Sequence, residues 1–256
     1  MNALRCTRTL LAVTLALTLS CGTTAPETGD VRVLLFTRTE GFRHESIGAA
    51  VSALRRVGSA AGVTVDVTED PSVFNATDLA RYGAVVFLMT TGDVLDPPQQ
   101  DALMDYVRAG GGFAGVHSAT DTEYDWPWYG ELVGAYFDGH PSDPGVREGR
   151  LIVAVGATDH PATRGIPATW RRADEWYQFR NLQGGLTVLL DIDETSYKSP
   201  AERPALQPRP IAWFRPFDGG LSFYTALGHT NESWSEPLFV SHVWGGITAV
   251  LGQPGG

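Results

Sequence analysis

Short apolar runs alternate with amphipathic stretches between residues 31 and 116. The run 84–89 (AVVFLM) is apolar at every position, as in a strand that is covered on both faces. Residues 46–61 and 97–109 instead place apolar side chains at helical spacing, and the second stretch ends in a run of three glycines. This alternation predicts a doubly wound, mostly parallel α/β sheet of the flavodoxin-like type, with right-handed crossovers. The expected strands of this half are residues 31–36, 63–67, 84–89 and 113–116.

The second half of the chain has a less regular pattern. Asp218-Gly219-Gly220 separates two apolar runs, which predicts a hairpin or tight turn, and residues 238–251 predict a closing helix. The expected strands of this half are residues 151–155, 187–191, 211–215 and 221–226. Since no repeat or low-complexity block interrupts the pattern, we expect one domain over residues 31–252 with inserted loops.

The N-terminus predicts an export signal. Arg5 and Arg8 precede an apolar run over residues 10–19, which is shorter than the roughly 20 residues of a membrane-spanning helix. Ser20 and Cys21 end the run like a lipoprotein cleavage site. We therefore expect a signal peptide over residues 1–20, lipidation of Cys21, a polar tether over residues 21–30, and a membrane-anchored protein outside the cytoplasm. The alternative is an ordinary secretory peptide that leaves Cys21 as a free thiol.

Composition narrows the classes of function. The 256 residues include 19 Lys and Arg against 29 Asp and Glu, a net charge of −10, which argues against nucleic acid as a partner. Hydrophobic residues make up 43% and charged residues 19%, which argues against disorder. The two cysteines, Cys6 and Cys21, both precede the expected domain, so that domain has neither a thiol nucleophile nor a thiolate metal site.

Polar residues follow several of the expected strands. His44 follows the first strand, Thr91 the third, His117 the fourth and His229 the run 221–226. In open parallel sheets, ligands bind outside the carboxyl ends of the strands, so we expect the three histidines to share one cleft. Each residue also has an ordinary explanation, because loop histidines are commonly solvated and Ser46 or its neighbour can cap a helix.

Three kinds of chemistry are compatible with these residues. Residues 115–119 resemble the turn where hydrolases expose a nucleophile, but His117 occupies the central position, so covalent acyl transfer is disfavoured. Acid–base catalysis by the three histidines, with Glu175 and Asp121 as carboxylate partners, is the leading prediction. A divalent metal ion held by His44, His117 and His229 stays open as a cofactor. The remaining histidines are interpreted as structural: His140, His160 and His242.

Aromatic residues beside polar ones favour a sugar as the small-molecule partner. Residues 124–129 and 174–180 combine aromatic rings with carboxylates and amides, a combination that suits the stacking and hydrogen bonding of sugars. The alternative is that these rings pack in the core. The substrate-binding residues that we expect are Thr91, Trp176, Tyr177 and Glu232.

The chain resembles the ThuA-like family, named for trehalose utilisation, which belongs to the class I glutamine amidotransferase-like superfamily. The resemblance implies the fold of that superfamily and the handling of sugars, including keto-derivatives of disaccharides formed by partner oxidoreductases. It also implies no glutamine hydrolysis, because His117 stands where amidotransferases carry a catalytic Cys. The stretches that carry it are VLLFTRTEGFRHESI (33–47), GGGFAGVHSATDT (110–122), FDGHP (137–141), TDHPATRGIP (158–167), DEWYQF (174–179), PIAWFR (210–215) and FYTALGHTNESW (223–234).

Three hypotheses of function follow. The first is an exported enzyme of carbohydrate utilisation, a hydrolase or a lyase or isomerase, that acts on a glycoside or keto-sugar by acid–base chemistry with or without a metal. The second is a sugar-binding lipoprotein without catalysis. The third is a structural module with an inactive site, because a fold does not fix a function.

Overall fold

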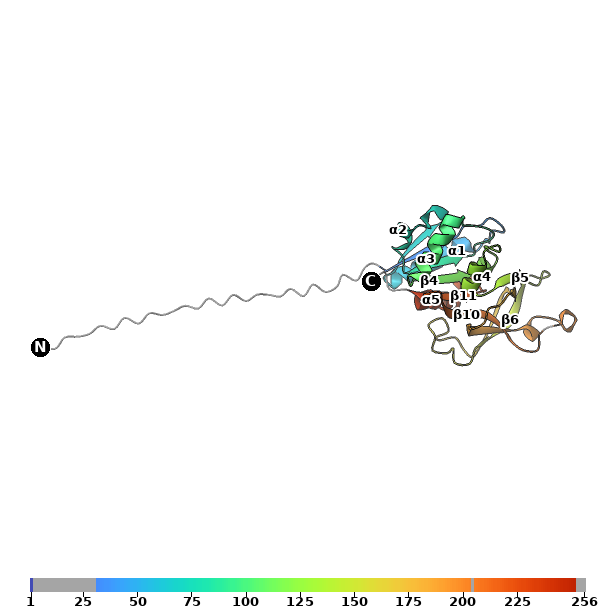
Figure 1. Cartoon of the computed structure of the whole chain (residues 1–256). Helices are drawn as coiled ribbons and strands as arrows, with labels where there is room; N and C mark the ends of the chain where they lie inside the picture. The colour runs from blue at the N-terminus through green and yellow to red at the C-terminus, as the bar shows by residue number, and fades with distance from the viewer. Residues whose placement is uncertain (2–30, 204, 252–256) are drawn as a thin grey trace.

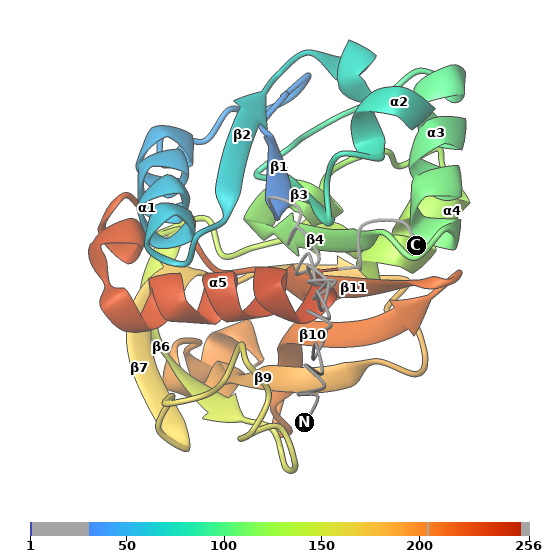
Figure 2. The same cartoon turned by 90° about the vertical axis from the view of Figure 1, so that its left-hand side faces the viewer.

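The computed structural model describes Met1, residues 31–203 and residues 205–251. Residues 2–30, residue 204 and residues 252–256 lie outside the described residues. Residues 2–30 include the expected signal peptide except Met1, the expected tether and Cys21. The described part folds around a nine-stranded sheet in the order β2-β1-β3-β4-β11-β10-β9-β6-β7 (Figures 1 and 2). The strands are, in that order, Thr64–Thr68, Arg32–Phe36, Ala84–Leu88, Gly112–Val116, Gly220–Thr225, Arg209–Phe217, Thr187–Asp193, Val146–Val153 and Thr169–Glu175.

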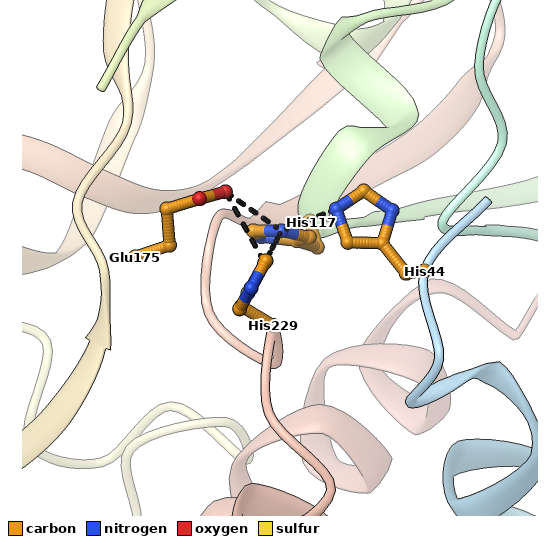
Figure 3. A group of neighbouring side chains, drawn as sticks. All are labelled: His44, His117, Glu175 and His229. Carbon is orange, nitrogen blue, oxygen red and sulfur yellow. Dashed lines mark hydrogen bonds and ion pairs between the residues drawn. The ribbon is translucent and has the colours of Figure 1, made fainter. Parts of the chain in front are cut away.

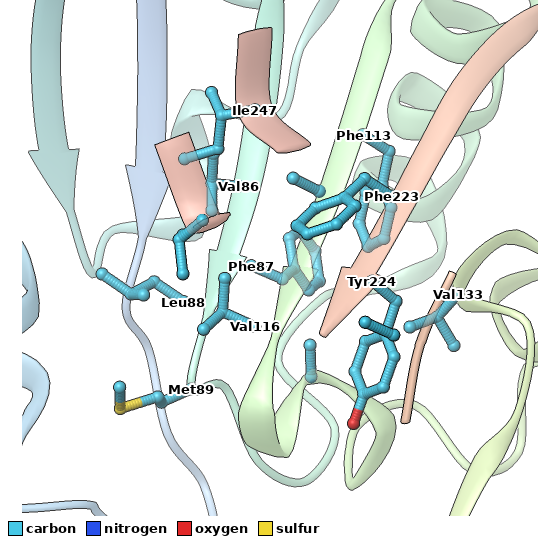
Figure 4. Close-up of a cluster of buried hydrophobic side chains, with 14 of the residues drawn as sticks. Val86, Phe87, Leu88, Met89, Phe113, Val116, Val133, Phe223, Tyr224 and Ile247 are labelled. Atoms are coloured by element: carbon cyan, nitrogen blue, oxygen red, sulfur yellow. The ribbon is translucent and has the colours of Figure 1, made fainter. Parts of the chain in front are cut away.

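The first five strands of this order are all parallel, as the alternating pattern predicts. Strand β3 is buried at each of its five positions, which agrees with its unbroken apolar sequence. Helices α1 (Ile47–Ala60) and α5 (Pro237–Val250) cover one face, and α3 (Pro97–Arg108) and α4 (Pro127–Val133) cover the other (Figure 2). The hydrophobic core lies between these layers, with Phe87, Phe113 and Phe223 among its fully buried side chains (Figure 4).

The last four strands extend the sheet with antiparallel pairings. Only β10 and β6 run against the other seven strands of this sheet, so β7 ends at the same side as β1, β4 and β11. The end of β7 also hydrogen-bonds the loop that follows β11, although three strands separate the two in the sheet order. The sheet must therefore curl back on itself, and it brings the end of β7 to the carboxyl side of the parallel half.

The structure confirms a mostly parallel α/β fold with insertions, but the second half contains more strands than we expected. Strand β7 was not predicted, and β6 begins at Val146 instead of residue 151. A separate two-stranded sheet joins β5 (Tyr136–Gly139) to β8 (Gln178–Arg180), and neither strand was predicted. The short helices are α2 (Ala76–Leu79) and the 3-10 turns η1 (Pro71–Val73), η2 (His117–Thr120), η3 (Glu194–Ser196), η4 (Pro200–Glu202) and η5 (Glu232–Ser235).

Helix α5 joins the two halves, because it lies between the sheet and the loop that connects β6 to β7. A Cβ atom at Gly246 would lie 2.2 Å from the Phe223 ring, and one at Gly245 would lie 2.2 Å from the Pro161 carbonyl oxygen. His242 makes the same connection, since its Nδ1 donates to the Ala162 carbonyl and its Nε2 accepts from the Thr225 hydroxyl. In the described part of the chain, no helix is both long and apolar enough to span a bilayer.

We expect Gly245→Ala to lower the free energy of unfolding by about 3 kcal/mol, because the added methyl group overlaps backbone that cannot easily move. Gly48→Ala in helix α1 is the matched control: no atom lies within 4 Å of the position that its Cβ would take, so we expect no loss and a gain of up to about 1 kcal/mol. Chemical denaturation measures both. Equal stabilities for the two variants would contradict the close packing of α5 against the β6–β7 loop.

Candidate functional site

Four side chains from four separate elements point to one place at the carboxyl side of the sheet (Figure 3). His44 lies in the loop between β1 and α1, and His117 begins η2 directly after β4. His229 lies in the loop between β11 and η5, and Glu175 is the last residue of β7. One ligand atom from each residue lies within 4.8 Å of the ligand atoms of the other three. The structure thus brings together the three histidines and the carboxylate that the sequence predicts as partners.

The backbone at His117 aims its imidazole into this cluster. Its φ of 54° is in the left-handed region, which a residue with a side chain seldom adopts, and it occurs at the strand-to-helix turn where the sequence resembles a nucleophile elbow. The Nδ1 atom lies 2.7 Å from the Ala226 carbonyl oxygen. That oxygen only accepts, so Nδ1 carries a proton, and in the neutral ring Nε2 presents a lone pair to the cluster.

The loop that carries His44 is held by Thr91. The Thr91 hydroxyl accepts from the Gly41 amide at 3.1 Å and donates to the Phe42 carbonyl at 3.0 Å. Ser46 holds the other end, since its hydroxyl donates to the Gly228 carbonyl and makes no capping bond to helix α1. The alternative in which Ser46 caps helix α1 does not hold, because its hydroxyl instead connects the His44 and His229 loops.

Electrostatics in the cluster distinguish its members. Burial, followed by the imidazoles of His117 and His229, lowers the pKa of His44 to about 3, so this ring is neutral. Burial would raise the pKa of Glu175, but hydrogen bonds and charges from His117 and His229 outweigh burial and hold that pKa well below its usual range. The hydrogen bond to Glu175 raises the pKa of His229 against the effect of burial. An ionised carboxylate thus faces a neutral imidazole at His44 and an imidazole at His229 whose protonated form it stabilises.

The arrangement fits a divalent cation. The Nε2 atom of His117 is 3.1 Å from Nε2 of His44, 3.2 Å from Nδ1 of His229 and 3.5 Å from Oε2 of Glu175. Lone pairs at these separations repel one another unless a proton or metal ion lies among them. Ligands of a tetrahedral zinc ion lie about 3.3 Å apart, and three imidazoles with one carboxylate suit Zn²⁺ and similar divalent ions. The carbonyl behind His117 fixes its tautomer, as metal-bound histidines require.

A pocket of about 350 Å³ opens onto the cluster. Its walls include His44 and His229, while His117 is fully buried. Phe42 stands at this pocket with 66% of its surface exposed, and its ring meets the His44 ring edge to face at 4.9 Å. The other lining residues are mainly polar: Glu45, Ser46, Val146, Thr230, Asn231 and Glu232. A buried donor set below a polar pocket with one exposed ring suits a small polar ligand.

The other predicted residues lie at different distances from this centre. Glu232 lines the pocket, and Thr91 holds the Phe42 backbone. Tyr177 packs its ring against His117 at 4.4 Å between centroids, but it does not line the pocket. Asp121 accepts a hydrogen bond from Tyr124 and is not one of the four clustered ligands. Their catalytic and binding roles stay predictions.

Trp176 requires a correction. Its indole is fully buried, packs over Gly149 and donates to the Arg147 carbonyl, so no surface is left for a substrate. The rings of residues 124–129 form a packed group as well, in which Trp126 stacks on Trp128 at 5.1 Å. Core packing, the alternative considered for these aromatic residues, therefore holds for Trp176, while Trp126 and Trp128 are partly buried and pack against the core.

Two residues were missed as parts of the site. His140 was interpreted as structural, yet its Nδ1 lies 3.3 Å from Oε1 of Glu175, and its ring stacks near Tyr177. The signal that could have found it is its place in the stretch FDGHP. Phe42 was missed although it lies two residues before His44. A single aromatic residue predicts sugar stacking less strongly than the stretches 124–129 and 174–180, which each contain several. By contrast, His160 and His242 are not members of the cluster.

Comparison with known proteins shows the family and the fold of the chain. The family model for ThuA, described as trehalose utilisation, matches residues 32–248. No curated protein matches the sequence. A ThuA-like protein from Bacteroides uniformis superposes with a TM-score of 0.68 at 19% identity, covering 92% of this chain and 99% of that one. A second, from Parabacteroides merdae, gives 0.66 at 19% identity and covers 86% and 90%.

A cytoplasmic protein of Salmonella typhimurium has the same fold at greater distance, with a TM-score of 0.59 and 12% identity over 87% of this chain and all of that one. At these identities the superpositions show the fold, and the family model adds a match across the strands and loops that build the cluster. The chain therefore belongs to the ThuA family, whose role is in trehalose utilisation.

Proposed function

We propose that the protein is a sugar-active enzyme whose reaction takes place at a divalent metal ion held by His44, His117, His229 and Glu175. The observation that carries this proposal is the convergence of three imidazole nitrogens and one carboxylate oxygen below a polar pocket. The family's role in trehalose utilisation supports a neutral disaccharide or its keto-derivative as the substrate class that we propose. The reaction class is hydrolysis, elimination or isomerisation.

In this proposal, the residues at the site have distinct roles. A bound metal ion would polarise a carbonyl or hydroxyl oxygen, or lower the pKa of bound water. Phe42 offers an exposed ring on which the C–H face of a sugar can stack, and Thr230 and Asn231 offer partners for its hydroxyls. Glu45 and Glu232 provide carboxylates at the pocket that can accept or return a proton. Glutamine hydrolysis is not part of this mechanism, because His117 stands at the elbow in place of a thiol.

The pocket also favours uncharged ligands. Glu45 and Glu232 are exposed carboxylates among its lining residues, and none of the described residues that line it is Lys or Arg. A phosphorylated sugar would meet like charges there, whereas hydroxyl groups can donate to carboxylates. We therefore assign the site to an unphosphorylated sugar.

We further propose that the protein is exported and anchored through Cys21. The support is sequence alone: Arg5 and Arg8, the apolar run 10–19 and the small residue before the cysteine. An exported location is consistent with an uncharged substrate, because the protein would bind the sugar before any phosphorylation inside the cell.

The metal is tested by elemental analysis of protein purified without chelator. We expect about one equivalent of a divalent transition metal in the wild-type protein and less than a tenth of that in His117→Gln, which loses the central ligand. His160→Gln makes the same substitution outside the cluster and should keep the full equivalent. A wild-type protein that neither retains nor takes up stoichiometric metal would contradict the proposal.

Binding of trehalose, followed by calorimetry, tests the sugar pocket. Phe42→Ala should weaken binding about tenfold, because it removes the exposed ring on which the sugar stacks. Leu206→Ala removes another exposed apolar side chain that does not line the pocket, and it should leave binding unchanged. Equal affinities for the two variants would remove Phe42 from the binding site. Binding without turnover of any neutral sugar would favour the non-catalytic sugar-binding alternative.

Incorporation of radiolabelled fatty acid in a bacterial host tests the anchor. We expect labelling of the wild-type protein and of Cys6→Ala, and none of Cys21→Ala, because acyl chains attach to the cysteine that follows the cleavage site. Cys6 is the matched control, since it is the other cysteine of the chain. Unlabelled wild-type protein would show that Cys21 is not lipidated.

A further inference from the structure

Strand β7 buries a charged pair next to the cluster. Its sequence, TWRRADE, places Trp170, Arg172 and Asp174 on alternate positions, all of them buried, whereas Thr169, Arg171 and Ala173 are exposed. Asp174 is completely buried and directly precedes Glu175. A buried carboxylate is costly unless it is paired and hydrogen-bonded, so its partners indicate what it holds in place.

The partners of Asp174 are the backbones of two cluster residues. Its Oδ1 accepts from the Glu175 amide at 2.9 Å and from the His229 amide at 3.1 Å. Its Oδ2 accepts from the Gly228 amide at 2.9 Å. Gly228 has a φ of 115°, which disfavours any residue with a side chain, so the chain turns sharply just before His229. One carboxylate therefore fixes both the end of β7 and the loop after β11.

Arg172 fixes the carboxylate in turn. Its Nη2 lies 3.2 Å from Oδ2 of Asp174 and donates to the Ser233 hydroxyl at 2.6 Å. Its Nη1 lies 3.1 Å from Glu236 at the start of α5, and its guanidinium lies over the Phe239 ring at 4.3 Å. Contacts on several sides leave the pair little freedom to move.

Asp174 does not contact a substrate, because it is fully buried and is not among the lining residues of the pocket. Asp174 instead sets the distance between two cluster atoms. Nδ1 of His229 and Oε2 of Glu175 are 3.2 Å apart, although three strands lie between β11 and β7 in the sheet order. Partners that orient metal ligands in this way commonly change metal affinity 10- to 100-fold, an order-of-magnitude range.

We infer that Asp174, locked by Arg172, is a positioning residue that sets the His229–Glu175 half of the cluster and thereby its affinity for a divalent ion. The inference rests on the proposed metal site. It adds that the inserted antiparallel strands are coupled to the histidines by one carboxylate and not only by general packing.

The chain contains a control for a purely structural role. Asp193 at the end of β9 also pairs with an arginine, Arg150, and also accepts a backbone amide, that of Thr195. It is not part of the cluster. Asp193→Asn and Asp174→Asn therefore each remove a negative charge from a carboxylate–arginine pair, although Arg150 is more exposed than Arg172. Of the two carboxylates, Asp174 is the one that accepts from the backbone amides of cluster ligands.

The experiment measures the dissociation constant for Zn²⁺ by competition with a chromophoric chelator, well below the melting temperature of each variant. We expect Asp174→Asn to weaken Zn²⁺ binding 10- to 100-fold, in the order-of-magnitude range for such partners, and Asp193→Asn to leave it within about twofold. Wild-type affinity in folded Asp174→Asn would overturn the inference, as would an equal loss in Asp193→Asn. If Asp174→Asn does not fold, Arg172→Lys replaces it in the experiment, because this change keeps the positive charge but loses the planar contacts of the guanidinium. An unchanged affinity of Arg172→Lys for Zn²⁺ would again overturn the inference.

A second readout does not need the metal. In metal-free protein, the imidazole ¹⁵N signals of His229 should shift in Asp174→Asn, while those of His160 in the β6–β7 loop stay in place. Unshifted His229 signals would overturn the inference. If the wild-type protein binds no Zn²⁺ but His229 shifts, the proposed metal site fails while the positioning role of Asp174 stands.

Discussion

The structure depends on one unfavourable arrangement: acceptor atoms with lone pairs are held facing one another. In the neutral His117 ring, Nδ1 donates to the Ala226 carbonyl and Nε2 carries a lone pair, and this Nε2 lies within 3.5 Å of two other imidazole nitrogens and a carboxylate oxygen. The fold brings these groups together through strained backbone at His117 and a buried ion pair behind Glu175. A proton or a divalent cation among these atoms relieves their mutual repulsion, and a divalent cation is the basis of the proposed chemistry.

Sheet direction explains how the centre is assembled. The ends of β1, β4 and β11 lie at one side of the parallel half and supply three histidines, as expected for this class of fold. The carboxylate comes from β7, which reaches the same side because the antiparallel extension restores the strand direction and curls back. The elbow that presents a thiol in amidotransferases presents the His117 imidazole here, so the same backbone turn carries a different side chain.

The sequence predicted what depends on local pattern and strand order. Regular apolar runs identified the parallel strands, and the carboxyl-end rule placed His44, His117 and His229 together. Prediction from the sequence failed where the answer depends on long-range pairing. Strand β7 contains several charged residues and so does not resemble a buried strand, yet Arg172 and Asp174 are buried there as an ion pair. Trp176 was assigned to substrate binding because its ring suits a sugar, but the ring is buried in the core. His140 was interpreted as structural; its approach to Glu175 depends on β5 and β7, two strands that were not predicted.

The most direct measurement is anomalous X-ray scattering at the absorption edge of the metal found in the purified protein. The account predicts one anomalous peak about 2 Å from Nε2 of His44, Nε2 of His117, Nδ1 of His229 and a Glu175 carboxylate oxygen. Density showing the four side chains turned away from one another, or a peak at another site with none here, would contradict it.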